Sequence, residues 1–325
     1  MGYNYNAKLN PPDKSIDVNM EKPAVIKMMQ ILCQNKQTDF ECALLPFENV
    51  KYSRITIPRN ELYSENFHGR DMTVHVIEPN LIQAENDHDT RPAMIYFHGG
   101  AFALPVQEPA IKLAAFYAAK TGRKIYIPEY LLLPDACGDE IFLDCLYAWN
   151  SITSDKFVQR HNLDVNDIVL YGESAGGALA AGVTMYIQDH GIKGYTMPSK
   201  MMLIYPVLDD EKYYKSKTSY ADAAWSEGSN ESMWNAYMSG VDESWNKYLI
   251  PASELEELET FPETYIEPQE MDILHDEAIY FGETLQEKGI SCHIVEIPGS
   301  YHSFDYDIDN EYVRAIVEKR IEYIQ

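Results

Sequence analysis

The sequence predicts an α/β protein in which helices cover both faces of a mostly parallel central sheet. Short apolar runs alternate with helical patterns along most of the 325 residues, which is typical of parallel strands joined by crossover helices. One apolar run, residues 168–171, leads through a turn of small residues directly into a helical pattern at 176–190. We find no internal repeat that would favour another architecture.

The N-terminal part of the chain predicts a helix followed by two strands. Residues 1 to about 18 are polar and contain a Pro-Pro pair, so we expect them to be extended or loosely ordered. A helix over 20–37 is predicted by four apolar residues at helical spacing, Val25, Met28, Met29 and Leu32. Strands are expected at 50–57 and 72–78, before a charged loop at 83–91.

The middle and the end of the chain supply the remaining strands and helices of the sheet. Apolar runs predict strands at 94–97, 124–128, 168–171, 201–206, 263–268 and 291–297. Helical patterns lie between them at 108–121, 139–153 and 176–190.

One segment, 208–261, is long, poor in strand patterns and rich in aromatic residues. It contains Tyr213, Tyr214, Tyr220, Trp225, Trp234, Tyr237, Trp245 and Tyr248. We expect a helical cap here, inserted between two strands, with helices near 230–238 and 244–249. Its aromatic residues either line a ligand pocket or pack the cap together. The predicted organisation is a cap segment at 1–46, a core at 47–207, the cap insertion at 208–261 and the rest of the core at 262–325.

The most informative motif is Gly172-Glu173-Ser174-Ala175-Gly176, which stands between a predicted strand and a predicted helix. This pattern is typical of a nucleophile elbow, where a strained turn projects a serine hydroxyl clear of the sheet. Side chains at the two outer glycines would collide with the strand or helix beside the turn. Ser174 is therefore the candidate nucleophile.

A second motif supplies candidate donors for an oxyanion. The strand at 94–97 ends in His98-Gly99-Gly100-Ala101, and small residues let the backbone approach a substrate oxygen. Gly100 and Ala101 are the candidate N–H donors there, and Ala175, directly after the serine, is the third. A tight strand-to-helix turn would explain the same loop without any catalytic role.

A nucleophilic serine needs a base and an acid that orients it. His302 and Asp272 each follow a predicted strand and stand in the order serine, acid, histidine. Asp276 is the alternative acid, although it falls inside the next predicted helix. His275 and His293 are expected to be surface or packing residues, and Glu173 to be a structural hydrogen-bonding partner.

Together these motifs resemble the hormone-sensitive-lipase-like carboxylesterases, a branch of the α/β-hydrolases with an N-terminal cap. The resemblance rests on 172–177, 98–100, 272–276 and 301–304, and it extends over roughly residues 47–325. It implies an α/β-hydrolase fold with a helical cap, Ser174, Asp272 and His302 as the catalytic triad, and Gly100, Ala101 and Ala175 as the oxyanion hole. It also implies a structural role for His98, which would brace its loop.

The chain departs from the usual pattern of that family at four places. Ala101 stands where the family usually has a third glycine, and Glu173 where aspartate is more usual. The segments 301–304 and 130–134 also differ. None of these changes removes a catalytic group, but they suggest a different substrate pocket.

The implied activity is hydrolysis of short-chain, acetyl-like esters through an acyl-enzyme, with a small-molecule ester as the partner and no cofactor. The resemblance also implies a homodimer formed through the last strand, expected at 291–297. Two alternatives remain open: a non-catalytic small-molecule-binding protein on a hydrolase scaffold, and an amide deacylase or peptidase with the same triad.

Composition and charge narrow the partners and the location. The formal net charge of −25 argues against nucleic acid and anionic membranes as partners. We expect most of this charge to be solvated, notably at 254–259 and 305–311. The five cysteines show neither a metal-ligand spacing nor an even count, no apolar run is long enough to span a membrane, and the N-terminus lacks a signal-peptide pattern. We therefore predict a cytoplasmic protein without a metal, flavin or nicotinamide.

Overall fold

The computed structural model describes residue 9 and the ranges 18–36, 40–44, 46–59, 71–80, 90–191 and 195–325. The predictions for residues 1 to about 18 and for most of the charged loop at 83–91 concern residues outside these ranges. The N-terminal helix is α1 (Pro23–Lys36), which begins at a proline that its first turn tolerates, and a short helix α2 (Phe40–Ala43) follows it.

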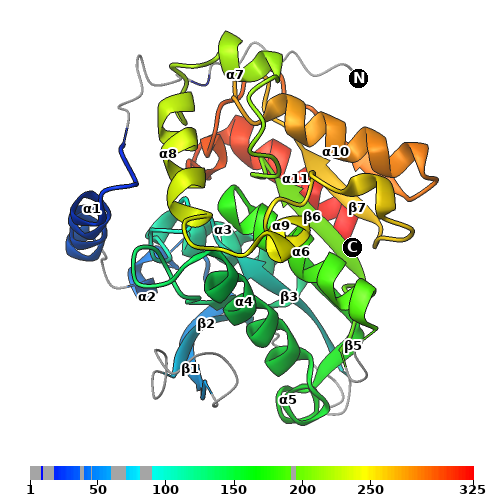
Figure 1. Cartoon of the computed structure of the whole chain (residues 1–325). Coiled ribbons are helices and arrows are strands. Elements are labelled where there is room, and N and C mark those ends of the chain that lie inside the picture. Colours follow the sequence, from blue (N-terminus) through cyan, green and yellow to red (C-terminus); the bar gives the residue numbers. More distant parts are fainter. Residues whose placement is uncertain are drawn as a thin grey trace.

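An eight-stranded sheet forms the centre of the molecule (Figure 1). Its order is β1-β2-β4-β3-β5-β6-β7-β8; β2 is antiparallel to both neighbours, and all the other pairs are parallel. The strands are β1 (Val50–Ile57), β2 (Met72–Pro79), β3 (Arg91–Phe97), β4 (Lys124–Pro128), β5 (Leu163–Glu173), β6 (Lys200–Ile204), β7 (Thr264–Glu267) and β8 (Cys292–Ile294). The mostly parallel sheet is thereby confirmed.

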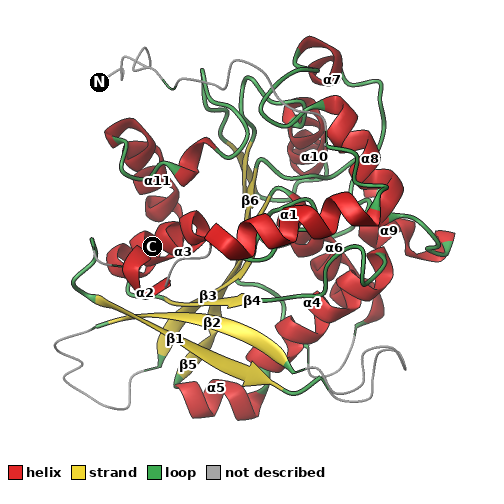
Figure 2. Ribbon diagram, turned by 90° about the vertical axis from the view of Figure 1, so that its left-hand side faces the viewer, coloured by secondary structure: helices red, strands yellow, loops and turns green. Residues whose placement is uncertain are grey.

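Helices cover both faces of this sheet (Figure 2). On one face lie α3 (Glu108–Thr121) and α11 (Glu311–Ile324); on the other lie α4 (Gly138–Thr153), α6 (Ala175–His190) and α10 (His275–Glu287). Each face has its own cluster of buried apolar residues. The sequence did not predict α11 or the helix α5 (Asp155–His161).

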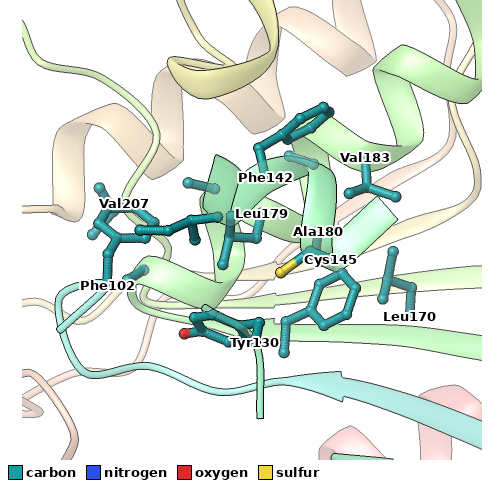
Figure 3. Close-up of a cluster of buried hydrophobic side chains, with 14 of the residues drawn as sticks. Phe102, Tyr130, Phe142, Cys145, Leu170, Leu179, Ala180, Val183 and Val207 are labelled. Atoms are coloured by element: carbon teal, nitrogen blue, oxygen red, sulfur yellow. The ribbon is translucent and has the colours of Figure 1, made fainter. Parts of the chain in front are cut away.

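The helix that follows Ser174 is built from small residues, and this lets the chain pack closely around it. Figure 3 shows Leu179, Ala180 and Val183 of α6 among Phe102, Phe142 and Val207 from other elements. A Cβ added at Gly182 would lie 1.9 Å from the carbonyl oxygen of Tyr248. The segment 208–261 therefore lies directly against the core helix.

The segment 208–261 contains short helices and no strand among the named elements. They are α7 (Lys215–Ser219), α8 (Glu227–Tyr237), η2 (Glu243–Trp245), α9 (Asn246–Leu249) and η3 (Leu255–Glu257). The chain before α1 is joined to α8, because the hydroxyls of Ser229 and Ser232 accept the backbone N–H groups of Val18 and Met20 at 2.8 and 3.1 Å.

Three differences from the sequence expectations affect the site. β5 runs eleven residues to Glu173, rather than four, because Leu163 also pairs with Arg91 of β3, ahead of an irregularity in the register of the two strands. β8 covers only Cys292–Ile294 of the predicted 291–297, and Ile297 forms an isolated bridge to Gln269. α10 begins at His275 itself. No helix in the described part of the chain is long and apolar enough to cross a membrane.

Candidate active site

Ser174 lies on a strained turn between β5 and α6. Its φ is +51° and its ψ is −124°, a conformation that non-glycine residues rarely adopt. A Cβ added at Gly176 would lie 2.0 Å from the carbonyl oxygen of Phe97, and one at Gly172 would lie 2.3 Å from that of Gly176. The backbone N–H of Ser174 donates to Ile204 at 3.0 Å, so neighbouring strands hold the turn in place.

The structure brings Ser174, His302 and Asp272 together above the carboxyl ends of the strands. The Oγ atom of Ser174 lies 2.9 Å from Nε2 of His302, and Nδ1 of His302 lies 2.7 Å from Oδ2 of Asp272. Asp272 is fully buried, and its Oδ1 accepts the N–H of Leu274 at 3.1 Å. With the Nδ1 proton directed at Asp272, Nε2 is free to accept the serine proton.

The alternative acid and histidines lie elsewhere. Asp276 accepts the N–H of Ser216 at 2.9 Å, and its other oxygen lies 2.7 Å from Nδ1 of His275. His293 is more than half exposed and lies 3.4 Å from Glu263. The geometry therefore favours Asp272 over Asp276 as the partner of His302.

The loop after β3 has an unusual backbone at the candidate oxyanion donors. Gly100, Ala101 and Phe102 all have positive φ, at 109°, 55° and 56°. Gly100 and Ala101 line the same pocket as Ser174. Ala175 is the first residue of α6, so its N–H has no carbonyl partner within the helix. All three predicted donors thus surround the serine.

His98 braces this loop from behind. Its ring stacks on Tyr130 with 4.3 Å between the centroids, and the Tyr130 hydroxyl donates to the His98 carbonyl at 2.6 Å. Burial lowers the pKa of His98, so its imidazole is neutral near pH 7. This agrees with the structural role expected for it.

Glu173 is a buried hydrogen-bonding partner, as the sequence predicted, but its surroundings were missed. Its carboxyl group accepts from the hydroxyl of Tyr306 at 2.6 Å and from the N–H of Gly99 at 3.3 Å. Asp305, expected to be solvated with the rest of 305–311, is instead fully buried, because Arg320 pairs with it at 2.6 Å. The acidic residues at 254, 256, 257 and 259 are exposed as expected.

A pocket of about 240 Å³ opens over Ser174. Its apolar wall includes Val18, Met20, Met29, Leu104 and Trp225, and its polar wall includes Gln107, Glu173, His302, Ser303 and Tyr306. The α1 region and the segment 208–261 thus both contribute to the wall.

Of the eight aromatic residues singled out in 208–261, Trp225 is the one that lines this pocket. Its ring centroid lies 6.1 Å from that of His302. Tyr237 instead stacks on Phe102 at 3.8 Å, and Tyr248 stacks on Phe142 at 6.0 Å, so these two pack the segment onto the core.

Two further observations concern metals and thiols. Within the residues that the structure describes, no group of three or more His, Cys, Asp or Glu side chains could hold a metal ion. No disulfide bond joins the described cysteines, Cys33, Cys137, Cys145 and Cys292. The side chain of Cys42 is not described.

With this geometry established, comparison with known proteins places the chain in a family. Residues 94–306 match the α/β hydrolase fold family. The chain is 28% identical to Lipase 2 of Moraxella sp. (strain TA144) over 74% of its own length and 60% of that protein, and 25% identical to an esterase of Gibberella moniliformis over 66% and 67%. The chain thus spans less than two thirds of the lipase.

A solved structure shares the fold. Esterase LipW from Mycobacterium marinum superposes with a TM-score of 0.79 at 19% identity, covering 95% of this chain and 91% of that one. The matched family, the relatives and the sheet agree, and the chain belongs to the α/β-hydrolase fold family, in its hormone-sensitive-lipase-like branch.

Proposed function

We propose that the protein is a serine carboxylesterase that hydrolyses short-chain, acetyl-like esters through an acyl-enzyme intermediate. The observation that carries the proposal is the continuous chain of hydrogen bonds from the Ser174 hydroxyl through His302 to buried Asp272, on the wall of a small pocket.

In the first half of the reaction, His302 Nε2 takes the Ser174 proton as Oγ attacks the ester carbonyl carbon. The tetrahedral intermediate then collapses, the bond to the alcohol oxygen breaks, and the imidazolium returns its proton to the leaving alcohol. In the second half, His302 removes a proton from water, which attacks the acyl-serine. The bond between the acyl carbon and Oγ then breaks, the imidazolium returns its proton to Oγ of Ser174, and the carboxylic acid leaves. Asp272 keeps the imidazole in the required tautomer and stabilises its charged form.

We propose that the N–H groups of Gly100, Ala101 and Ala175 bind the oxyanion of the intermediate. Each such donor contributes roughly 2.7–4 kcal/mol to lowering the barrier in comparable sites. The replacement of a glycine by Ala101 keeps the backbone N–H, so it removes no donor.

The preference for short acyl chains is supported by the size of the pocket, about 240 Å³, which the acyl group and the alcohol must share. Residues 1–46 and 208–261 form the cap in this proposal, and 47–207 and 262–325 form the core. We further propose that the protein is cytoplasmic, which the absence of disulfides among the described cysteines supports, and that it binds neither nucleic acid nor membranes, which its charge of −25 supports. A homodimer that pairs through β8 stays a prediction.

The test is hydrolysis of p-nitrophenyl acetate, butyrate and octanoate by the wild-type enzyme and by Ser174→Ala. We expect acetate and butyrate to be preferred and the variant to lose at least about 10⁴-fold in kcat. Equal rates for the two proteins would exclude the mechanism.

Two controls separate the alternative functions. A fluorophosphonate probe should label the wild-type protein at Ser174; a folded protein that is not labelled would be a binding protein on a hydrolase scaffold. Matched acetate esters and acetanilides compare the two leaving groups, and faster cleavage of the anilides would favour an amide deacylase.

A further inference from the structure

A cluster of buried acidic and phenolic side chains lies directly behind the proposed nucleophile. Glu173 at the end of β5 and Asp305 in η4 (Phe304–Tyr306) are both fully buried, and both contact the hydroxyl of Tyr205. That hydroxyl lies 3.2 Å from Oε2 of Glu173 and 2.5 Å from Oδ1 of Asp305. Tyr205 also packs its ring 4.8 Å from that of His302.

The backbone of Tyr205 is itself unusual. Its φ is +36°, a value that a bulky residue rarely adopts, and its N–H donates to the carbonyl of Glu267 at 2.9 Å. Strain of this kind persists only where the surrounding structure fixes it, and it is concentrated at functional sites. The hydroxyl is therefore held between the two carboxyl groups.

The Tyr205 hydroxyl cannot donate to two ionised carboxylates at once. A tyrosine hydroxyl has one proton to donate, whereas an ionised carboxylate can only accept. Tyr205 contacts two carboxyl groups at hydrogen-bond distance, so one of the two must donate to the phenolic oxygen. Glu173 and Asp305 together therefore hold one proton.

The surrounding charges indicate which carboxyl group holds it. Arg320 pairs with Asp305 at 2.6 Å and binds Glu267 through two further contacts, of 2.5 and 2.7 Å. In the described part of the chain, no lysine, arginine or histidine forms an ion pair with Glu173. Asp305 has a cation to compensate its charge and Glu173 has none, so the proton belongs on Glu173.

The contacts of Glu173 fit a neutral carboxylic acid. Oε1 accepts from the hydroxyl of Tyr306 and from the N–H of Gly99, as a carbonyl oxygen does, while Oε2 contacts the Tyr205 hydroxyl. The buried hydroxyl of Tyr96 also faces this carboxyl group. A carboxylic acid with its proton on Oε2 satisfies all three contacts. Burial, and after it the charge of Asp305, raise the pKa of Glu173.

We propose that Glu173 is protonated in the working enzyme, shares that proton with Asp305 through Tyr205, and in this neutral form positions Gly99 and Tyr306 around Ser174. Gly99 leads into the loop that carries the proposed oxyanion donors, and a Cβ added there would lie 3.0 Å from that of Ser174. Tyr306 lines the pocket. A neutral group behind the serine also avoids repelling the oxyanion that the reaction forms.

The groups that face Glu173 come from several elements. They are Tyr96 of β3, His98 and Tyr130 beside the glycine loop, Tyr205 after β6, and Asp305 and Tyr306 of η4, with Arg320 of α11 behind Asp305 and His302 beside Tyr205. Near pH 7 the phenols are neutral and His98 is neutral, so Asp305 is the charge that opposes ionisation of Glu173.

A direct test does not depend on catalysis. Infrared difference spectra of the wild-type protein against Glu173→Gln should show the carbonyl stretch of a protonated carboxylic acid, shifted in D₂O, that the variant lacks. Tyr205→Phe should keep this band at a shifted position, because the acid loses the phenolic oxygen that accepts its proton. If the band is retained in Glu173→Gln, or is lost in Asp305→Asn but not in Glu173→Gln, the assignment is wrong.

The kinetic test rests on the proposed function. As the pH rises through the pKa of Glu173, wild-type kcat/KM should fall, and in Glu173→Gln this fall should be absent. Tyr306→Phe removes a hydrogen bond that lowers this pKa, so the fall should move to higher pH by about one unit. An identical alkaline limb in all three proteins would overturn the proposal, whereas failure of the proposed function would abolish turnover and leave the infrared result intact.

Discussion

The pocket has two kinds of wall, and they differ in how firmly the chain holds them. The core wall consists of loops at the strand ends, where Ser174 is 7% exposed and Asp272 is fully buried. The wall formed by the proposed cap, here the cap wall, includes α1, whose outer face exposes Met28, Ile31 and Leu32 by 52–56%. α1 is anchored by a few side-chain contacts, among them those of Gln30 with the carbonyls of Ala103 and Leu133 at 2.8 and 2.9 Å.

This difference suggests a division of roles between the two walls. The core loops are fixed by buried backbone hydrogen bonds, and they carry every group that the proposed chemistry needs. The cap contributes apolar surface, so it can alter which ester fits without altering how the ester is cleaved. Changes to each wall should therefore give different kinetic signatures.

The largest effect is expected for Asp272→Asn in the core. An amide at this position favours the wrong tautomer of His302, so kcat should fall about 10⁴-fold for every ester tested. The matched control is Asp276→Asn, which changes the contacts with His275 and Ser216 and should alter kcat by less than about tenfold. Comparable losses in the two variants would mean that the acid has been misassigned.

The next largest effect is expected on the free energy of unfolding, at the contact between the proposed cap and the core. Lys217 of α7 and Glu277 of α10 form a buried ion pair at 3.1 Å. Burial raises the pKa of Glu277 from 4.5 to about 7, against the opposing effect of Lys217. A raised acid pKa favours folding while the group stays protonated, so this contribution is complete below pH 4.5 and is lost as the pH rises through about 7.

The free energy of unfolding should therefore decline over this range by about 3 kcal/mol at most from Glu277 alone. Urea titrations between about pH 4 and about pH 8, limits that lie outside both pKa values, measure the decline. In Glu277→Gln the decline should be smaller by this amount, because the amide does not titrate. Parallel curves for the two proteins would show that Glu277 is ionised throughout.

The sequence predicted the core far better than the cap and the buried charges. Strands are indicated by the periodicity of apolar residues, and the elbow by the local sterics of its glycines. β1 and β4 were accordingly predicted with their observed bounds. Ser174 and His302 each follow a strand of the parallel sheet, and the carboxyl ends of such strands lie at one edge. The sequence could therefore predict that the two residues lie at the same edge, although their contact also depends on the strand order.

Long-range charge pairing produces features that local sequence patterns do not predict. Asp305 stands in an acidic run that looks solvated, and its partner Arg320 belongs to a helix that the apolar pattern did not single out. Likewise, no local signal distinguishes Trp225, which lines the pocket, from Tyr237, which packs against Phe102. Both outcomes depend on how distant segments meet in three dimensions.

A smaller, selective effect is expected for Trp225→Ala in the cap. Removing the indole enlarges the pocket near His302, so the ratio of kcat/KM for octanoate to kcat/KM for acetate should rise. We expect a rise of about tenfold, which is the discrimination that one or two methylene groups produce in an apolar site. Trp245, which stacks on Tyr186 and lies outside the residues lining the pocket, is the control, and Trp245→Ala should leave the ratio unchanged. A uniform loss on all esters from Trp225→Ala would contradict the division of roles.

The smallest effect concerns backbone strain in the core wall. Ala101 has a φ of +55°, which disfavours an L-residue by about 1 kcal/mol, whereas glycine adopts this conformation freely. Ala101→Gly and Ala103→Gly both remove a buried methyl group and both add freedom to the unfolded chain. Since Ala103 is not among the residues of positive φ, its variant should be the less stable of the two by about 1 kcal/mol in urea unfolding. Equal stabilities would mean that the loop relaxes on substitution, and the core wall would then be no more rigid than the cap.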